Sequence, residues 1–131
     1  MILVDTSVWI DHLRYHDDAL ANLLNTSQVL MHPYILGELA CGNLTNRTVL
    51  LHLLAALPQI STALDKEVLF FIEQRALMGK GIGYIDAHLL AAVALHGTAR
   101  IWTRDKRLHK VAETLSLASS MATSMTGDAP I

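Results

Sequence analysis

The chain has 131 residues, of which 52% are hydrophobic and 17% are charged, and its formal net charge is −2. This length suits one domain with its own core. The slight negative charge excludes attraction of nucleic acid by overall charge, and the single cysteine, Cys41, excludes an internal disulfide. The uncharged run 48–64 is too short, and too interrupted by Pro58 and polar residues, to span a membrane. We expect a soluble cytoplasmic protein, with no room for a signal peptide before the first strand.

The first stretch of the chain predicts a strand, a carboxylate and a helix in immediate succession. The run Ile2–Val4 is too short for a helix and wholly apolar, which is typical of a central parallel strand buried on both faces. Asp5 follows it, and Thr6 or Ser7 can cap a helix that continues through Leu13. Binding sites in open α/β sheets lie at the carboxyl ends of strands, so Asp5 stands where a site is expected.

The rest of the chain alternates short strands with helices. Further strands are predicted at 28–31, 59–61, 100–103 and 117–118. Helices are predicted from Asp17 or Asp18 to Leu24, from Pro33 to near Gly42, at 47–57, from Asp65 to Leu77, at 84–96 and from Asp105 to Leu115. The glycine-rich stretch 79–83 follows a helix rather than a strand, so we interpret it as a connection and not as a phosphate-binding loop. The alternation predicts one α/β domain over residues 1–118, with helices on both faces of a parallel sheet of four to five short strands, and a flexible tail at 119–131.

Four carboxylates occupy positions that suggest a common site. Asp5 ends the first strand, and Asp105 lies just past the strand 100–103. Glu38 lies in the helix after the second strand, on a face that is not plainly solvated. Asp86 lies in the first turn of its helix, on an apolar face where an unpaired carboxylate is costly. Taken singly, Asp105 can also be a helix N-cap and Asp86 can simply favour its helix dipole.

Carboxylates that share a crevice repel one another, and a divalent cation relieves that repulsion. Mg²⁺ prefers oxygen ligands and is usually held by a few carboxylates together with water and substrate phosphate. Such a site can activate water and stabilise a displacement at phosphorus. The sequence therefore favours a magnesium-dependent reaction at a phosphate ester.

The stretches that carry these acids resemble the PIN-domain ribonucleases of the VapC toxin type, from bacterial toxin–antitoxin pairs. The matching stretches, in the family's order, are Val4–Val8, Gly37–Leu39, Ile85–Ala87 and Trp102–Leu108. The resemblance covers roughly residues 1–118. It implies the three-layer α/β/α PIN fold, endonucleolytic cleavage of tRNA, rRNA or mRNA, a VapB-type antitoxin as partner and a homodimer.

The resemblance also implies roles for individual residues. Its catalytic acids are Asp5, Glu38, Asp86 and Asp105, which bind Mg²⁺ or Mn²⁺, with Asp5, Asp86 and Asp105 as the direct metal ligands. Supporting hydroxyl groups are those of Thr6 and Thr103.

Half of the ten lysine and arginine residues are concentrated in one short stretch. They are Arg100, Arg104, Lys106, Arg107 and Lys110. Such a run is often only a solvated helix face. Arg104, Lys106 and Arg107 nevertheless flank Asp105, where they can hold RNA phosphates beside the metal.

The helix predicted at 47–57 is apolar almost all round, so it is either core or a surface that a partner covers. We favour a partner surface shared with the helix that begins at Asp65.

A phosphatase and a receiver-like phosphoacceptor domain both fit the sequence poorly. A phosphatase with Asp5 as nucleophile needs a second Asp where Ser7 stands, and a receiver-like domain needs a strand-end Lys where Lys106 is already helical. The remaining alternative is a catalytically inactive PIN-like module that binds RNA or protein. A complete set of four acids argues against it, because buried charge without a use is costly.

Overall fold

The computed structural model describes residues 1–121, which form seven helices and three strands. In chain order the elements are β1 (Ile2–Val4), α1 (Thr6–Tyr15), α2 (Asp18–Asn25), β2 (Val29–Leu30), α3 (Pro33–Ala40), α4 (Arg47–Ala55), α5 (Asp65–Gln74), α6 (Tyr84–His96), β3 (Arg100–Trp102) and α7 (Lys106–Thr114). This alternation confirms the predicted α/β class. No helix within residues 1–121 is long and apolar enough to cross a membrane.

The three strands form one parallel sheet in the order β2-β1-β3, so the first strand is the central one, as predicted. Leu3 pairs with Leu30 on one side and with Ile101 on the other. Leu3 and Val4 are fully buried, because helices cover both faces of this strand. The carboxyl ends of all three strands consequently lie at one edge of the sheet, where Asp5 follows β1.

The described residues form three strands rather than the predicted four to five. Each of the other two predicted segments makes a single parallel bridge, Gln59 to Met31 beside β2 and Ala118 to Ile101 beside β3. The sheet therefore has five positions, but its two outer segments are too short to count as strands. Pro58 lacks an N–H group and directly precedes Gln59, which limits the ladder on that side.

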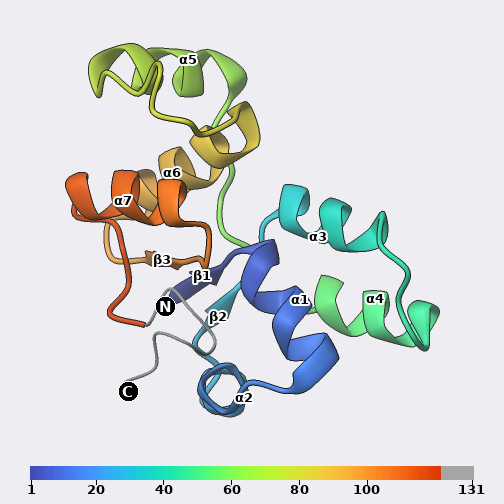
Figure 1. The fold of residues 1–131 in the computed structure, drawn as a ribbon. Coiled ribbons are helices and arrows are strands. Elements are labelled where there is room, and N and C mark those ends of the chain that lie inside the picture. Colours follow the sequence, from blue (N-terminus) through green and yellow to red (C-terminus); the bar gives the residue numbers. More distant parts are fainter. Residues whose placement is uncertain (122–131) are drawn as a thin grey trace.

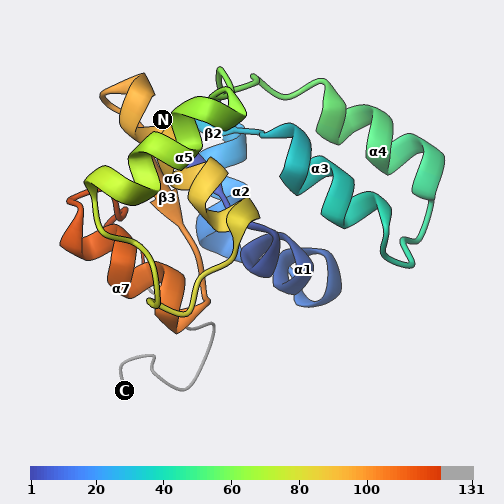
Figure 2. The same cartoon turned by 90° about the horizontal axis from the view of Figure 1, so that it is seen from above.

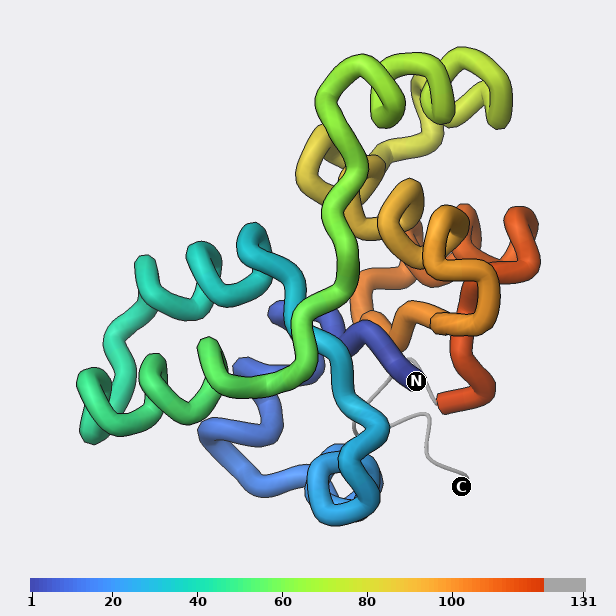
Figure 3. The backbone as a smooth tube through the Cα atoms, turned by 180° about the vertical axis from the view of Figure 1, so that it is seen from behind, coloured from blue at the N-terminus to red at the C-terminus, as the bar shows by residue number. Residues whose placement is uncertain are grey.

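Helices cover the sheet from two sides in a three-layer α/β/α arrangement. Figure 1 shows α1, α3 and α4 on one side of the sheet and α5, α6 and α7 on the other. Seen from behind, the extended segment 56–64 carries the chain from one helix group to the other (Figure 3). Connections between parallel strands are right-handed. Connections that cross the sheet in opposite directions therefore lie on opposite faces, which produces the two groups of helices.

The helix α5 ends earlier than the sequence indicates, at Gln74 instead of near Leu77. Ala76 adopts a left-handed conformation with φ of 53°, and the N–H of Leu77 then donates to the carbonyl of Ile72 at 3.0 Å. This is the hydrogen bond of a Schellman helix end, and it folds Leu77 back into the core. The end is hard to predict because alanine, not glycine, holds the left-handed position.

The predicted surface shared by α4 and α5 is wrong, since these helices lie on opposite sides of the sheet (Figure 1). The helix α5 lies across α6 instead, as Figure 2 shows from above. Each helix still exposes large apolar side chains. Val49 and Leu53 of α4 are 63% and 60% exposed, and Leu69 and Phe70 of α5 are 58% and 65% exposed.

Two residues that follow the predicted boundary at residue 118 contact the rest of the protein. The N–H of Ser119 donates to the carbonyl of Ile101 at 2.8 Å, and Met121 packs against the core. The rest of the predicted tail, residues 122–131, lies outside the described residues.

A buried histidine caps the start of α3 beside the sheet. His32 is only 1% exposed, and its Nδ1 accepts a hydrogen bond from the N–H of Tyr34 at 3.0 Å. The ring proton must then reside on Nε2, which is buried and has no hydrogen-bond partner within residues 1–121. Burial, followed by the nearby His88, lowers the pKa of His32 to about 4.

This histidine makes the free energy of unfolding depend on pH. In the unfolded chain His32 binds a proton near its ordinary pKa of about 6.5, whereas the folded protein does so only near 4. Stability should therefore fall as pH decreases from 6.5 to 4, by roughly 3 kcal/mol from this residue. The variant His32→Asn keeps a capping acceptor but cannot titrate, so its stability should change less in this window, as measured by urea unfolding at several pH values. His52→Asn removes an exposed histidine and should follow the wild-type profile; identical profiles for all three proteins would contradict this role.

Candidate metal centre and active site

Asp5 is the most buried carboxylate at the carboxyl edge of the sheet, with 8% of its surface exposed. Its Oδ2 accepts two hydrogen bonds of 2.8 Å, one from the hydroxyl of Thr103 after β3 and one from that of Ser7 in α1. Asp5 occupies the N-cap position of α1, yet its side chain makes no capping hydrogen bond. Its carboxylate therefore binds the side-chain hydroxyl groups of Thr103 and Ser7 and does not cap the helix.

The two hydroxyl groups also bind the chain that follows β3. Ser7 Oγ accepts the N–H of Arg104 at 3.0 Å, and Thr103 Oγ1 accepts the N–H of Asp105 at 3.1 Å. The turn that carries Asp105 is thus fixed to the carboxylate that ends β1. The predicted supporting residue Thr103 lies here, fully buried beside Asp5.

Glu38 reaches the same edge of the sheet from α3. Its Oε1 accepts a hydrogen bond of 2.6 Å from the hydroxyl of Thr6, the first residue of α1. The sequence indicated a face that is not plainly solvated, but Glu38 is exposed. Its link to Thr6, and not burial, therefore holds it near the strand ends.

Asp86 and Asp105 complete the group, and each also supports its own helix. Asp86 accepts the N–H of Gly83 at 3.2 Å in the first turn of α6, and Asp105 caps α7 by accepting the N–H of Leu108 at 3.0 Å. The simpler interpretation of Asp105 as an N-cap is thus correct, and it uses only one of the two carboxylate oxygens.

The pKa of Asp86 is raised by burial and by the other three acids. Burial raises this pKa most, and the charges of Asp5, Asp105 and Glu38 raise it further, against the opposing effect of the Gly83 N–H. The charges of the other three acids therefore reach Asp86, and the use of all four in one site stays a prediction.

These carboxylates have the donor chemistry of a divalent cation site. In each of the four, one oxygen accepts a hydrogen bond from another residue of the fold, while the other oxygen makes no hydrogen bond within residues 1–121. None of them forms an ion pair with a Lys, Arg or His in that part of the chain. Within residues 1–121, no three His, Cys, Asp or Glu side chains lie close enough together to hold a metal ion as they stand, so the four acids would have to move closer to share one. Unpaired carboxylate oxygens at a sheet edge suit Mg²⁺ or Mn²⁺, which take oxygen ligands and retain water.

Ser7 was not among the site residues that the sequence indicated, although it contacts Asp5 directly. A serine at the start of a helix is usually a helix cap. The sequence therefore offered no reason to expect the hydrogen bond of Ser7 to Asp5. Its hydroxyl lies 3.3 Å from that of Thr103, so the two side chains enclose Asp5 Oδ2 together.

Arg104 does not lie at the rim of the acidic group, where RNA contact was expected. Its guanidinium donates to Asp11 at 2.8 Å and to Asp17 at 2.6 Å, and the side chain is only 9% exposed. It also lies over the Trp102 ring, 5.4 Å from the ring centroid. Arg104 is therefore a structural residue that connects the end of β3 to α1 and the start of α2.

Asp11 and Asp17 bind this guanidinium, and Asp17 has a second role. Asp17 does cap α2, through the N–H of Leu20 at 2.9 Å. Burial alone would raise the pKa of Asp17, but the Leu20 N–H and Arg104 hold it below its ordinary value. By contrast, Lys106 and Arg107 are exposed, and neither forms an ion pair within residues 1–121.

Comparison with known proteins agrees with this geometry. The PIN domain pattern matches residues 2–114, which include every element from β1 to α7. This chain belongs to the PIN-domain family. It is 52% identical over 108 residues to Ribonuclease VapC32 of Mycobacterium tuberculosis, in strain CDC 1551 / Oshkosh and in strain ATCC 25618 / H37Rv. The match covers 82% of this chain and 87% of the relative, so this is a PIN domain of the VapC type over most of its length.

The structural role of Arg104 in this PIN domain leads to a stability prediction. Arg104→Met leaves Asp11 and Asp17 partly buried without a cation, so the free energy of unfolding should fall by about 3 kcal/mol. Arg107→Met removes the same charge from an exposed position and should change stability by less than about 0.5 kcal/mol. Urea unfolding measures both values, and equal stability of the two variants would show that Arg104 has no structural role.

The crowding of the acids leads to a second prediction. In EDTA, Asp86→Asn removes one of four repelling charges while keeping an oxygen for the Gly83 N–H, so Tm should rise by about 3 °C. Mg²⁺ should raise the Tm of the wild-type protein and should raise that of the variant much less. Glu73→Gln, an exposed change on α5, should leave both values as in the wild type. A lower Tm for Asp86→Asn in EDTA, with an undiminished response to Mg²⁺, would contradict a shared cation site.

Proposed function

We propose that this protein is a metal-dependent endoribonuclease and the toxin of a toxin–antitoxin pair. The observation that carries the proposal is the group of four carboxylates without cationic partners at the carboxyl edge of the sheet. It occurs in a PIN domain that is 52% identical to a protein named as a ribonuclease. A catalytically inactive RNA- or protein-binding module is less favoured, since nothing would offset the repulsion among these acids.

In this proposal Asp5, Asp86 and Asp105 hold Mg²⁺ or Mn²⁺, and Glu38 completes the acidic group. When bound, such a cation lowers the pKa of water and stabilises negative charge on a phosphate under attack. Thr103 and Ser7 fix Oδ2 of Asp5, which leaves the second oxygen of this carboxylate facing the site.

The supporting residue Thr6 fixes one carboxylate oxygen of Glu38, as Thr103 and Ser7 fix one of Asp5. By donating to Oε1, it directs this exposed side chain toward the other acids instead of into solvent. Glu38 then accepts hydrogen bonds from water near the scissile phosphate. Each acid thus has one oxygen for the fold and one for the reaction.

The RNA contacts that we propose beside the acids are Lys106 and Arg107, both exposed in the first turn of α7. Their cationic side chains suit phosphate oxygens, which position a strand without reading its sequence. Arg104, expected to share this role, is omitted because its guanidinium binds Asp11 and Asp17.

For the partners, we propose a VapB-type antitoxin and a second copy of this chain. The exposed apolar residues Val49 and Leu53 on α4 offer a surface that an antitoxin would cover, on the same side of the sheet as Glu38 in α3. Leu69 and Phe70 on α5 offer a separate apolar surface for a homodimer. An enzyme with RNA substrates would act in the cytoplasm.

Incubation of the purified, antitoxin-free protein with total bacterial RNA tests this function. With Mg²⁺ or Mn²⁺ we expect discrete fragments on a denaturing gel, and none in EDTA. Asp5→Asn, checked to be folded, should cut more than about 100-fold more slowly, because loss of groups that merely support a metal ligand already costs 10- to 100-fold.

Asp18→Asn provides a matched control, because it makes the same change at a side chain that is 96% exposed on α2. It should cut RNA at the wild-type rate. Intact RNA with folded protein and either metal would contradict the ribonuclease function, and equal cutting by Asp5→Asn would contradict the role of the acids.

A further inference from the structure

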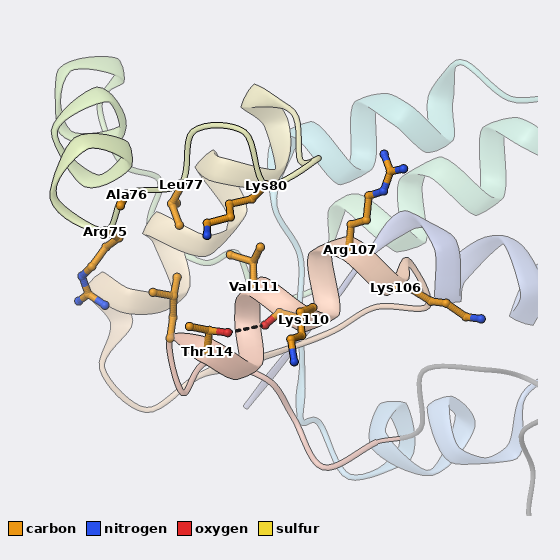
Figure 4. Close-up of a pocket in the computed structure, with 10 residues that line it drawn as sticks. Arg75, Ala76, Leu77, Lys80, Lys106, Arg107, Lys110, Val111 and Thr114 are labelled. Atoms are coloured by element: carbon orange, nitrogen blue, oxygen red, sulfur yellow. Dashed lines mark hydrogen bonds between the residues drawn. The ribbon is translucent and has the colours of Figure 1, made fainter.

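Half of the basic residues of this chain line one hollow beside α7. They are Arg75, Lys80, Lys106, Arg107 and Lys110, and no Asp or Glu lines the hollow, whose volume is about 420 Å³. Figure 4 shows that they come from two sides, Arg75 and Lys80 from the segment between α5 and α6, and the other three from α7. The sequence indicated the cluster on α7, but it did not indicate that the other two residues join it.

These cations have no anionic partner in the part of the chain that the structure describes. None of the five forms an ion pair within residues 1–121, and all five are exposed. The only acid within α7, Glu113, pairs with His109 at 3.3 Å instead. Like charges gathered in one hollow repel one another, so an anionic ligand would be stabilised there.

The hollow is formed by direct contact between two segments. Gly81 has φ of +83°, and a Cβ atom at this position would lie 2.6 Å from Cδ of Arg107. The backbone of the glycine-rich loop therefore rests on the Arg107 side chain, which only glycine permits without a shift. This loop is no phosphate-binding motif by its sequence, yet its position brings Lys80 opposite α7.

The floor of the hollow is apolar and its rim is cationic. Leu77, Val111 and Leu115 line it together with the basic residues. A nucleotide strand has the matching chemistry, with phosphates for the rim and sugar and base surfaces for the floor.

The hollow also lies next to the acidic group. Asp105 caps α7, and Lys106 and Arg107 are the first two residues of that helix. Lys110 lies one turn further along, about 6 Å from Lys106 along the helix axis. A strand that occupies the hollow can therefore continue to the four carboxylates.

We propose that this hollow is a second RNA contact, in which Arg75, Lys80 and Lys110 bind phosphates of the strand that is cut at the acidic group. The proposal rests on the ribonuclease function proposed above and deepens it. In this proposal the hollow binds the strand equally well in the substrate complex and in the transition state, so it sets affinity and leaves the chemical step unchanged. Removal of these charges should therefore raise KM and leave kcat unaltered.

The test uses Lys80→Gln, Lys110→Gln and their combination, at exposed positions where folding should be retained. With an RNA that the wild-type protein cuts, we expect the double variant to raise KM about 10-fold with kcat within twofold. Binding of the same RNA to Asp5→Asn protein, with and without the two changes, should differ about 10-fold. The slope of log K against log salt should become less negative by about 1.4 for two lost phosphate contacts.

Two controls separate a binding site from general charge loss. Lys66→Gln removes one exposed lysine that does not line the hollow, and it should leave KM as in the wild type. Lys80→Arg combined with Lys110→Arg keeps both charges and should retain wild-type affinity.

Three other outcomes would overturn the second RNA contact. Unchanged KM and salt slope in the double variant, while the wild type cuts RNA, would overturn the second contact and leave the ribonuclease function intact. If the wild type cuts no RNA, the binding comparison alone decides, and equal affinities would overturn the contact. Weaker binding of an antitoxin, with unchanged RNA binding, would assign the hollow to an acidic protein segment and overturn the RNA contact.

Discussion

The hydrogen bond between Thr103 and Asp5 joins the ends of the two longer strands, and the rest of the site depends on it. Asp5 ends β1 and Thr103 follows β3, so the bond forms only when these strands pair in the observed register. The same hydroxyl accepts the N–H of Asp105, which places a second acid and the start of α7 beside the first. Formation of the sheet and assembly of the site are therefore one event.

Charge is distributed over this small protein in two separate groups. Four carboxylates meet at the sheet edge without cations, and five cations meet beside α7 without acids. Arg104 stands between them in sequence, but Asp11 and Asp17 neutralise it, so it adds to neither group. In the function that we propose, this separation gives a chain with a net charge of −2 a cationic surface for RNA beside an acidic site.

Local sequence was sufficient for the features that depend on neighbours along the chain. Ile2–Val4 was predicted as the central strand because its residues are all apolar, and Asp5 and Asp105 were predicted from their places just after strands. Asp86 and Asp105 each left a simpler interpretation open, and the family resemblance supported all four acids.

The features that sequence did not reveal depend on contacts between distant segments. Arg104 pairs with residues 87 and 93 positions away, and no local pattern distinguishes such a pairing from a solvated cation. Ser7 resembles an ordinary helix cap, and Lys80 joins the hollow only because α5 ends early at the left-handed Ala76. The outer strands were overestimated because a one-residue bridge and a short strand have the same apolar composition.

The four carboxylates, in our proposal, share one divalent cation. The most direct test is a crystal structure of the protein soaked in Mn²⁺, with the metal located by anomalous scattering. We expect one Mn²⁺ within about 2.0–2.4 Å of oxygens of Asp5, Asp86 and Asp105, in density that is absent from crystals of Asp86→Asn. Mn²⁺ bound only elsewhere on the protein, or absent from this edge at concentrations that support RNA cleavage, would contradict it.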